Sequence, residues 1–156
     1  KRKVLVNPLV KTEDNYVMDL EGLERIFIEE KPKIILFCSP HNPVGRVWTR
    51  SELEAFGDLC FKYSVRIISD EIHADLVYKP NQHTALASLN DRFKSSVITL
   101  MAPTKTFNLA GLQSSYVISS DPSIIQVIEE NLSKIDLKRN NYFSLIGSMA
   151  AYQKGK

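Results

Sequence analysis

Residues 97–111 read VITLMAPTKTFNLAG, and this stretch decides how the rest of the chain is interpreted. Its first part, 97–101, has the length and the β-branched content of a buried strand. Pro103 ends the hydrogen-bonding ladder because it has no N–H to donate. Lys105 is therefore predicted to lie just beyond the carboxyl end of a strand, which is where the ligands of open α/β sheets bind.

Lys105 is the candidate catalytic residue of this stretch. An amine held in such a crevice can be partly desolvated, which lowers its pKa and lets it attack a carbonyl carbon as a free amine. The alternative is a solvated lysine in a turn, which is the commoner situation for this residue type. Only the segments that surround Lys105 in the fold can decide between the two interpretations.

The composition indicates one globular domain without an electrostatic partner. The chain has 156 residues, of which 44% are hydrophobic and 24% charged, enough for one sizeable core. The formal net charge of +2 gives no reason to expect nucleic acid or an anionic membrane surface as a partner. No apolar run has the length of a membrane span, and no signal sequence is recognisable, so a cytoplasmic location is predicted.

The two cysteines, Cys38 and Cys60, lack the spacing of a metal clip or a disulfide framework. They are predicted to be buried thiols in a reducing compartment, and no metal site is expected. The chain has no initial methionine and enters a strand-like segment almost at once. We therefore expect it to be part of a longer protein.

Hydrophobic periodicity and cap signals predict alternating strands and helices. The predicted strands are 3–10, 33–38, 65–70, 97–101 and 112–119. Helices are predicted after Asp19, Thr49 and Asp121, and another is predicted over 142–152. Strands 33–38 and 65–70 are apolar on both faces, as is typical of parallel strands covered by helices on each side. Strand 112–119 follows its predecessor too closely for a crossover helix, so it should be antiparallel. The predicted fold class is α/β, with a mostly parallel sheet flanked by helices.

Three strand ends deliver polar side chains to one edge of this sheet. Asn42 follows the first of them in a turn held by Pro40 and Pro43, Asp70 ends the next strand, and Lys105 follows the third. Taken singly, Asp70 could be a helix cap and Asn42 an ordinary turn residue. Their combination with Lys105 at one edge predicts a functional site.

Three sequence blocks around these residues resemble the fold-type I pyridoxal-phosphate enzymes, which are the class I/II aminotransferases and their relatives. The blocks are PHNPVG at 40–45, SDEIHADL at 69–76 and APTKTFNLAGLQ at 102–113. The resemblance implies that the cofactor is pyridoxal 5'-phosphate and that Lys105 forms the internal aldimine with it. It also implies that Asp70 pairs with the pyridinium nitrogen and that Asn42 hydrogen-bonds the phenolic oxygen. These residue types suit the chemistry, because a carboxylate keeps the ring nitrogen protonated and a primary amine can leave and move a proton.

Two departures from the broad family pattern favour one branch of it. His73 stands where a tyrosine is usual, and Gln113 stands where an arginine usually grips the cofactor phosphate. Both substitutions look like the cystathionine β-lyase branch, the MalY/PatB-type carbon–sulfur lyases, and imply β-elimination on a sulfur-containing amino acid. His73 is expected near the phenolic oxygen, or else as a packing histidine. Thr104 is a candidate phosphate ligand through its hydroxyl, or else a turn residue.

Two other functions remain open at this point. The runner-up is an amino-acid aminotransferase, and a regulatory, ligand-sensing domain with the aminotransferase fold is the alternative from another class. The resemblance implies a homodimer in the full-length protein. It also implies that 1–156 is a partial cofactor-binding large domain, without its N-terminal part and without a C-terminal small domain. By itself the chain is expected to be inactive and to bind the cofactor weakly, because Gln113 cannot supply a positive charge to the phosphate.

Overall fold

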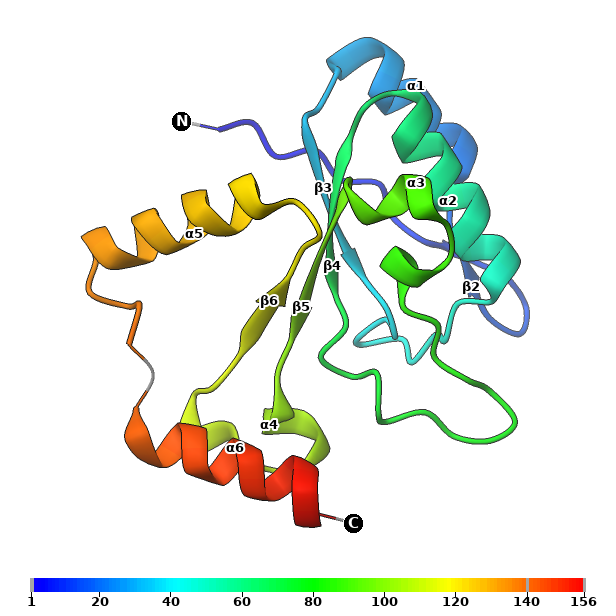
Figure 1. Ribbon diagram of the computed structural model, residues 1–156. Coiled ribbons are helices and arrows are strands. Elements are labelled where there is room, and N and C mark those ends of the chain that lie inside the picture. Colours follow the sequence, from blue (N-terminus) through cyan, green and yellow to red (C-terminus); the bar gives the residue numbers. More distant parts are fainter. Residues whose placement is uncertain (1, 140, 156) are drawn as a thin grey trace.

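A four-stranded sheet forms the centre of the molecule. The computed structural model describes residues 2–139 and 141–155. The sheet consists, in spatial order, of β3 (Ile34–Cys38), β4 (Arg66–Asp70), β5 (Val97–Met101) and β6 (Tyr116–Ile118) (Figure 1). The first three strands are parallel and β6 runs antiparallel to β5. The predicted α/β class, the mostly parallel sheet and the antiparallel last strand are therefore confirmed.

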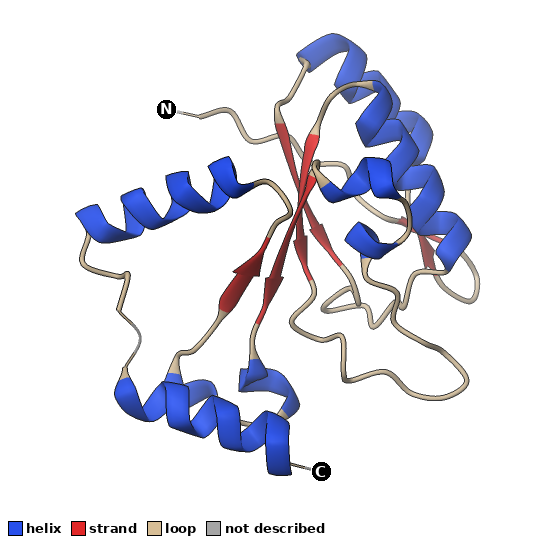
Figure 2. Cartoon of the chain, in the orientation of Figure 1, coloured by secondary structure: helices blue, strands red, loops and turns tan. Residues whose placement is uncertain are grey.

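The helices lie in two groups around this sheet. The first group packs on one face and comprises α1 (Leu20–Glu30), α2 (Arg50–Lys62), the 3-10 turn η1 (Leu86–Ser88) and α3 (Asp91–Lys94) (Figures 1 and 2). The second group follows β5 and comprises α4 (Pro103–Thr106), the 3-10 turn η2 (Ala110–Leu112), α5 (Pro122–Lys134) and α6 (Tyr142–Lys154). Within the described part of the chain, no helix combines the length and apolarity that a membrane span needs.

The long helices begin where the sequence places their caps. The Asp19 carboxylate accepts a hydrogen bond from Gly22 N at 2.8 Å and thereby satisfies one free N–H of α1. Thr49 and Glu52 form the reciprocal capping box at the start of α2. The side chains of Asp121 and Asn141 accept from Ser123 N and Phe143 N and cap α5 and α6. The four predicted helix starts are thus confirmed.

The core lies between the first group of helices and the sheet. It consists of apolar side chains from α1, α2, η1, α3, the helix-facing sides of β3, β4 and β5, and the segments that adjoin these elements: Leu23, Phe27, Phe37, Trp48, Leu53, Phe56, Cys60, Val65, Ile67, Leu86, Leu89, Phe93 and Val97. Phe37 and Phe56 stack with ring centroids 4.2 Å apart and join the sheet to α2. This core supports the segments that follow β3 and β4.

The predicted strand over 3–10 is wrong. Only β1 (Val10–Lys11) has strand geometry there, and it pairs with β2 (Tyr16–Val17) in a separate two-stranded sheet. Val4 and Val6 are 84% and 76% exposed. Alternating apolar residues favour a strand only where a neighbouring strand accepts their backbone hydrogen bonds, and among the described residues the part before Val10 has no such neighbour.

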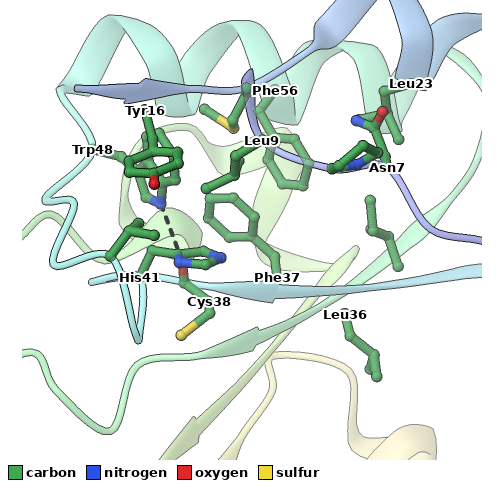
Figure 3. A pocket seen from close by; sticks show the side chains of 14 residues that line it. Asn7, Leu9, Tyr16, Leu23, Leu36, Phe37, Cys38, His41, Trp48 and Phe56 are labelled. Atoms are coloured by element: carbon green, nitrogen blue, oxygen red, sulfur yellow. Dashed lines mark hydrogen bonds between the residues drawn. The ribbon is translucent and has the colours of Figure 1, made fainter. Parts of the chain in front are cut away.

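The prediction that helices cover both faces of β3 is also wrong for the described residues. Phe37 is buried against α2, whereas Leu36 is 79% and Ile34 49% exposed on the opposite face. Figure 3 shows Phe37 and Leu36 on opposite sides of the strand. A strand sequence that is apolar on both faces does not predict which elements cover each face, or whether both faces are covered.

Candidate active site

The carboxyl ends of β3, β4 and β5 lie side by side at one edge of the sheet. Cys38, Asp70 and Leu100 are aligned across the three strands. Ser39 N donates to the Asp70 carbonyl, and Glu71 N donates to the Leu100 carbonyl, each at 3.0 Å. The segments that carry Asn42, Asp70 and Lys105 therefore leave the sheet from neighbouring positions, towards the end where α4 lies (Figure 1).

Asn42 lies in a turn that is fixed from behind by Trp48. His41 N donates to the Arg46 carbonyl at 2.8 Å, which closes the turn around Asn42. Trp48 is 1% exposed, and its indole N–H donates to the Cys38 carbonyl at 3.0 Å, drawn as the dashed line in Figure 3. The Arg46 guanidinium lies 4.7 Å from the centre of the Trp48 ring. The turn is thus attached to the core, while Asn42 itself is exposed.

Asp70 is the last residue of β4, and its carboxylate is exposed at the edge of the sheet. One carboxylate oxygen, Oδ1, accepts a hydrogen bond from Ile72 N at 3.2 Å. The neighbouring Cys38 thiol has its pKa raised, mainly by burial and also by the negative charge of Asp70, although the Asn42 N–H opposes this shift. A second carboxylate oxygen of Asp70 is available to a ligand on this side.

Lys105 and Thr104 lie in α4, a single helical turn that begins at Pro103 instead of the plain turn predicted from the sequence. Proline suits the first position of a helix because its fixed φ matches the helix and its missing N–H is not needed there. Phe107 N donates to the Pro103 carbonyl at 3.0 Å and closes the turn. The Lys105 side chain is exposed, so the partial desolvation considered from the sequence is not provided by the described residues.

A hydrogen bond joins the segment after β4 to the helix that carries Lys105. Thr106 Oγ1 donates to Asp75 Oδ2 at 2.8 Å, across 31 residues of chain. Asp75 belongs to the same loop as His73, and Thr106 is the neighbour of Lys105. The Asp70 and Lys105 segments are thus tied together outside the sheet as well as within it.

A cavity of about 230 Å³ brings Asn42 and His73 together. It lies between the 40–47 turn and the loop after β4, and Leu76 and Tyr78 also line it. The buried Nδ1 atom of His73 has no hydrogen-bond partner within the described part of the chain. Asp70, Thr104 and Lys105 are not among the residues that line this cavity. The structure thus gathers two of the predicted site residues in one cavity and the other three along the adjoining edge.

A second cavity, of about 390 Å³, lies on the helix-covered side of β3 (Figure 3). Leu9, Phe37 and Phe56 converge on it, and its polar side chains include Asn7 and His41. Burial lowers the pKa of His41, which favours the neutral imidazole. Because the cavity contains neither Lys105 nor Asp70 and is mainly apolar, it belongs to the packing behind the site.

Gln113 ends η2 in the left-handed region, at φ +50°, and its side chain is exposed. No arginine occurs between 102 and 119 of the sequence. A phosphate bound beside α4 would therefore meet only neutral donors and Lys105 from this part of the chain. In the described ranges, no group of three or more His, Cys, Asp or Glu side chains is arranged to hold a metal ion.

Two supporting residues were not identified from the sequence. Trp48 was not recognised as the anchor of the Asn42 turn, although an isolated tryptophan shortly after a turn with two prolines is a usable signal. Thr106 was not recognised as the link to Asp75, because a contact across 31 residues has no local sequence pattern. Both residues act on the placement of the predicted site residues.

Comparison with protein families decides the relationship. The family model "Aminotransferase class I and II" matches residues 3–153. The chain belongs to this family. Among curated members, cystathionine beta-lyase PatB of Bacillus subtilis is 40% identical over 154 residues, which cover 99% of this chain and 40% of that protein. Aspartate aminotransferase of the same organism is 31% identical, over 90% of this chain and 35% of that enzyme.

A solved structure of a pyridoxal-phosphate-containing protein has the same architecture. Cystalysin from Treponema denticola, whose crystal structure contains a pyridoxal 5'-phosphate cofactor, superposes with a TM-score of 0.94 and 33% sequence identity. The superposition covers 98% of this chain and 39% of the cystalysin chain. The chain thus spans about two fifths of the length of these relatives.

Proposed function

We propose that this chain is part of a pyridoxal-phosphate-dependent enzyme that cleaves the carbon–sulfur bond of a sulfur-containing amino acid, of the cystathionine or cysteine type, by β-elimination. The observation that carries the proposal is the arrangement of an amide, a carboxylate and a primary amine at three adjacent strand ends of a sheet. The identity to cystathionine beta-lyase PatB, and His73 and Gln113 in place of the tyrosine and arginine usual in the family, support the lyase assignment.

The described residues fit the proposed cofactor in their chemistry. A pyridoxal ring offers a basic nitrogen, a phenolic oxygen and an aldehyde, and the edge offers a carboxylate, an amide with a histidine, and an amine. Asp70 has a carboxylate oxygen available beyond the one that accepts from Ile72 N. The buried His73 Nδ1 has no protein partner among the described residues, which suits a polar ligand atom beside Asn42.

Asp70 is proposed to hold a proton on the ring nitrogen. When bound, pyridoxal phosphate supplies an electron sink for the negative charge that develops at the substrate α-carbon. An anionic carboxylate beside the ring nitrogen favours its protonated form, since opposite charges within about 4–6 Å stabilise each other. The hydrogen bond from Ile72 N restrains the carboxylate and leaves its other oxygen for this contact.

Lys105 is proposed to bind the cofactor covalently and to move the proton at the substrate α-carbon. Only a primary amine can do both, because a guanidinium neither condenses with an aldehyde nor gives up its proton near neutral pH. In β-elimination the Cα–H and Cβ–S bonds break, and the sulfur leaves as a thiol. The remaining unsaturated amino acid is then released and reacts with water to give pyruvate and ammonia.

Asn42, His73 and Thr104 are proposed to orient the cofactor. The Asn42 amide would donate to the phenolic oxygen, and His73, which lines the same cavity, would act beside it. Thr104, one residue before Lys105, would donate its hydroxyl to the phosphate. Because Gln113 is neutral, we expect the chain by itself to hold the phosphate weakly.

Aminotransfer to an oxo acid is the second candidate function, and it is supported by the identity to aspartate aminotransferase. Both reactions begin with removal of the α-proton by the same lysine, so the residues at this edge serve either one. They diverge afterwards, when the β-substituent leaves or the amino group is transferred. The product therefore distinguishes the two functions.

We also propose that the chain is a partial large domain of a longer, cytoplasmic, homodimeric enzyme, and that the chain alone is inactive. The span of about two fifths of the relatives supports the first part. The free Cys38 and Cys60 thiols are compatible with a reducing compartment. The homodimer rests on the resemblance to the family.

The full-length protein, loaded with pyridoxal phosphate, tests the proposal with cystathionine and with cysteine as substrates. We expect pyruvate and ammonia in equal amounts, without an added oxo acid. An amino group transferred to an oxo acid would instead identify an aminotransferase. Borohydride reduction followed by peptide mapping should place the cofactor on Lys105, and a reduced adduct on another lysine would refute the assigned role.

The Asp70→Asn variant of the same protein tests the role of the carboxylate. We expect it to bind the cofactor but to lose most of its turnover, by about a hundredfold or more, because the ring nitrogen is no longer held in its protonated form. Turnover close to wild type would contradict this role. Ser51→Ala, on the exposed side of α2, is a matched control that should leave turnover unchanged.

A further inference from the structure

Directly behind Asp70, the carboxylate of Glu71 is buried and fully engaged. The Glu71 side chain is 2% exposed. Its Oε1 atom accepts from Ser69 Oγ at 2.8 Å and from Leu86 N at 3.3 Å, and its Oε2 atom lies 2.8 Å from His83 Nε2. A buried carboxylate is costly unless it is hydrogen-bonded in this way. The proposed function gives this group no role.

The side chains of Asp70 and Glu71 lie on opposite faces of the sheet because the strand is pleated. Side chains alternate between the two faces of a strand, and burial alternates here from buried Ser69 to exposed Asp70 to buried Glu71. Ser69 and Glu71 thus lie on the helix-covered face, and Asp70 on the other. Holding the Glu71 side chain on the covered face therefore fixes the direction in which the Asp70 side chain leaves the backbone.

The same bonds close the loop that follows β4. His83 and Leu86 lie 12 and 15 residues beyond Glu71, so the carboxylate joins both ends of the loop. This loop includes Ile72, whose N–H restrains the Asp70 carboxylate, and Asp75, which accepts from Thr106 beside Lys105. The backbone is also held at this point by the bond from Glu71 N to the Leu100 carbonyl. If the Glu71 carboxylate lost its partners, the loop beyond that bond would be less restrained, and so would Ile72 N, which bonds the Asp70 carboxylate.

We propose that Glu71 is a positioning residue for the cofactor site: its buried hydrogen bonds to Ser69, His83 and Leu86 N hold the backbone after β4 so that the Asp70 carboxylate meets the cofactor ring nitrogen. This inference rests on the proposed function. Glu71 does not touch the cofactor in this scheme and acts through Asp70. The hydrogen bonds, more than the negative charge, carry the effect.

A double-mutant cycle in the full-length protein tests this positioning role. Pyridoxal phosphate affinity is measured by absorbance titration for the wild type, Glu71→Ala, Asp70→Asn and the double variant. We expect Glu71→Ala to raise the dissociation constant by about tenfold or more, the factor for one lost hydrogen bond to a charged group. In the Asp70→Asn background the same substitution should change it by less than about threefold, because the contact it supports is already gone.

A purely structural role gives a different result. If Glu71→Ala lowers affinity by the same factor in both backgrounds, or leaves affinity unchanged, the positioning role is wrong. Wild-type protein that binds no pyridoxal phosphate would overturn the proposed function together with this inference. Equal factors in the two backgrounds would overturn the inference alone.

Conservative and local variants separate hydrogen bonding from folding. Glu71→Gln should restore affinity to within about threefold of wild type, because the amide oxygen can accept from Ser69 and Leu86 N and the amide nitrogen can face His83 Nε2. A Glu71→Gln variant as weak as Glu71→Ala would contradict the claim that the hydrogen bonds carry the effect. Should Glu71→Ala not fold, His83→Ala replaces it in the cycle, since it removes one partner of the carboxylate and leaves the others.

Hydrogen exchange of the cofactor-free protein gives a readout that does not depend on catalysis. We expect Glu71→Ala and His83→Ala to accelerate exchange at the amides of 72–86, while Glu24→Ala, which removes the acceptor of Lys62 and Tyr63 on the helix-covered side, does not. Unchanged exchange at 72–86 in both variants would show that Glu71 does not hold this loop.

Discussion

The part of the chain before α4 and the part from α4 onward differ in how they are held. The core side chains lie before α4, between α1, α2, α3 and the sheet. Beyond β5, the larger buried apolar side chains of the described residues are Pro103, at the start of α4, and Ile124. Helix α6 is tied to η2 by the hydrogen bond from Ser144 Oγ to the Leu112 carbonyl. Asn42 and Asp70 are thus placed by a core, whereas Lys105 belongs to the more thinly packed part.

The second part is nevertheless apolar in composition. Val127 in α5 is 56% exposed, and Phe143 and Met149 in α6 are 73% and 60% exposed. The aromatic contact between Phe107 and Tyr152, with centroids 5.3 Å apart, is one of the few links between α6 and the segment after Lys105. Within these residues, the two parts of the chain should therefore respond differently to the same kind of substitution.

Truncating one aromatic side chain in each part should give the largest contrast. Phe56→Ala removes a ring that is 2% exposed and should lower the free energy of unfolding by about 3–5 kcal/mol. Phe143→Ala removes a ring that is already exposed and should change it by about 0.5 kcal/mol or less. Urea unfolding of the full-length protein measures both, and similar effects would show that α6 is packed as firmly as α2.

The Cys60 thiol should make the first part sensitive to alkali. Burial raises the pKa of Cys60 from 9.0 to about 12. A raised pKa in the native state favours the protonated thiol there, so this contribution to stability is complete below pH 9 and is lost as the pH rises towards 12. In this pH range, the free energy of unfolding should fall by up to about 1.4 kcal/mol per pH unit from this thiol.

Unfolding free energies measured between pH 8 and pH 11 test this alkaline effect of Cys60. The wild type should lose stability more steeply than Cys60→Ala, whatever their difference at pH 8. Val65→Ala, another buried truncation without an ionisable group, should keep the wild-type slope. Parallel curves for the wild type and Cys60→Ala would contradict the effect.

Removing a helix cap should give the smallest difference between the two parts of the chain. Thr49→Ala removes an N-cap worth about 1 kcal/mol, and Asp121→Ala removes the cap of α5. In α2 the loss should appear in global unfolding, because that helix carries the core. In α5 it should appear mainly as faster amide exchange within the first turn. Equal global losses for the two variants would remove the distinction between the parts.

The Asp121 cap should also depend on pH. Hydrogen bonds from the Ser123 hydroxyl and backbone N–H lower the pKa of Asp121. A lowered pKa in the native state gives stability that is present above the ordinary value of 3.8 and is lost as the pH falls through the lowered value. Asp121→Asn keeps a capping oxygen but cannot titrate, so the protection of the first α5 amides, relative to their intrinsic exchange at each pH, should stay constant in this variant and fall in the wild type. Equal loss of protection in both proteins would contradict this pH dependence.

Local signals predicted much of the fold. The caps Asp19, Thr49 and Asp121 and the β-branched run at 97–101 marked where helices and β5 begin. These signals work because capping bonds and strand propensity involve residues close in sequence. They failed at 3–10, where a strand depends on a partner elsewhere in the chain.

The sequence predicted those parts of the candidate site that depend on where strands end. Asn42, Asp70 and Lys105 could be assigned to one edge because parallel strands share their carboxyl side. The bonds of Glu71 to His83 and Leu86 N could not, because they close across a loop without periodicity. The exposure of Leu36 could not be predicted either. A strand that is apolar on both faces has the same sequence pattern whether helices cover one face or both.

The alternation at the end of β4 constrains how this protein can evolve. Inserting or deleting one residue within β4 would exchange the faces of Asp70 and Glu71, turning the ligand-side carboxylate inward and leaving the buried donors of Ser69 and His83 unmatched. Length changes in the exposed stretch 78–82 would leave the pleat intact. Natural variation in length should therefore accumulate in that stretch of the loop, while the number of residues in β4 stays the same.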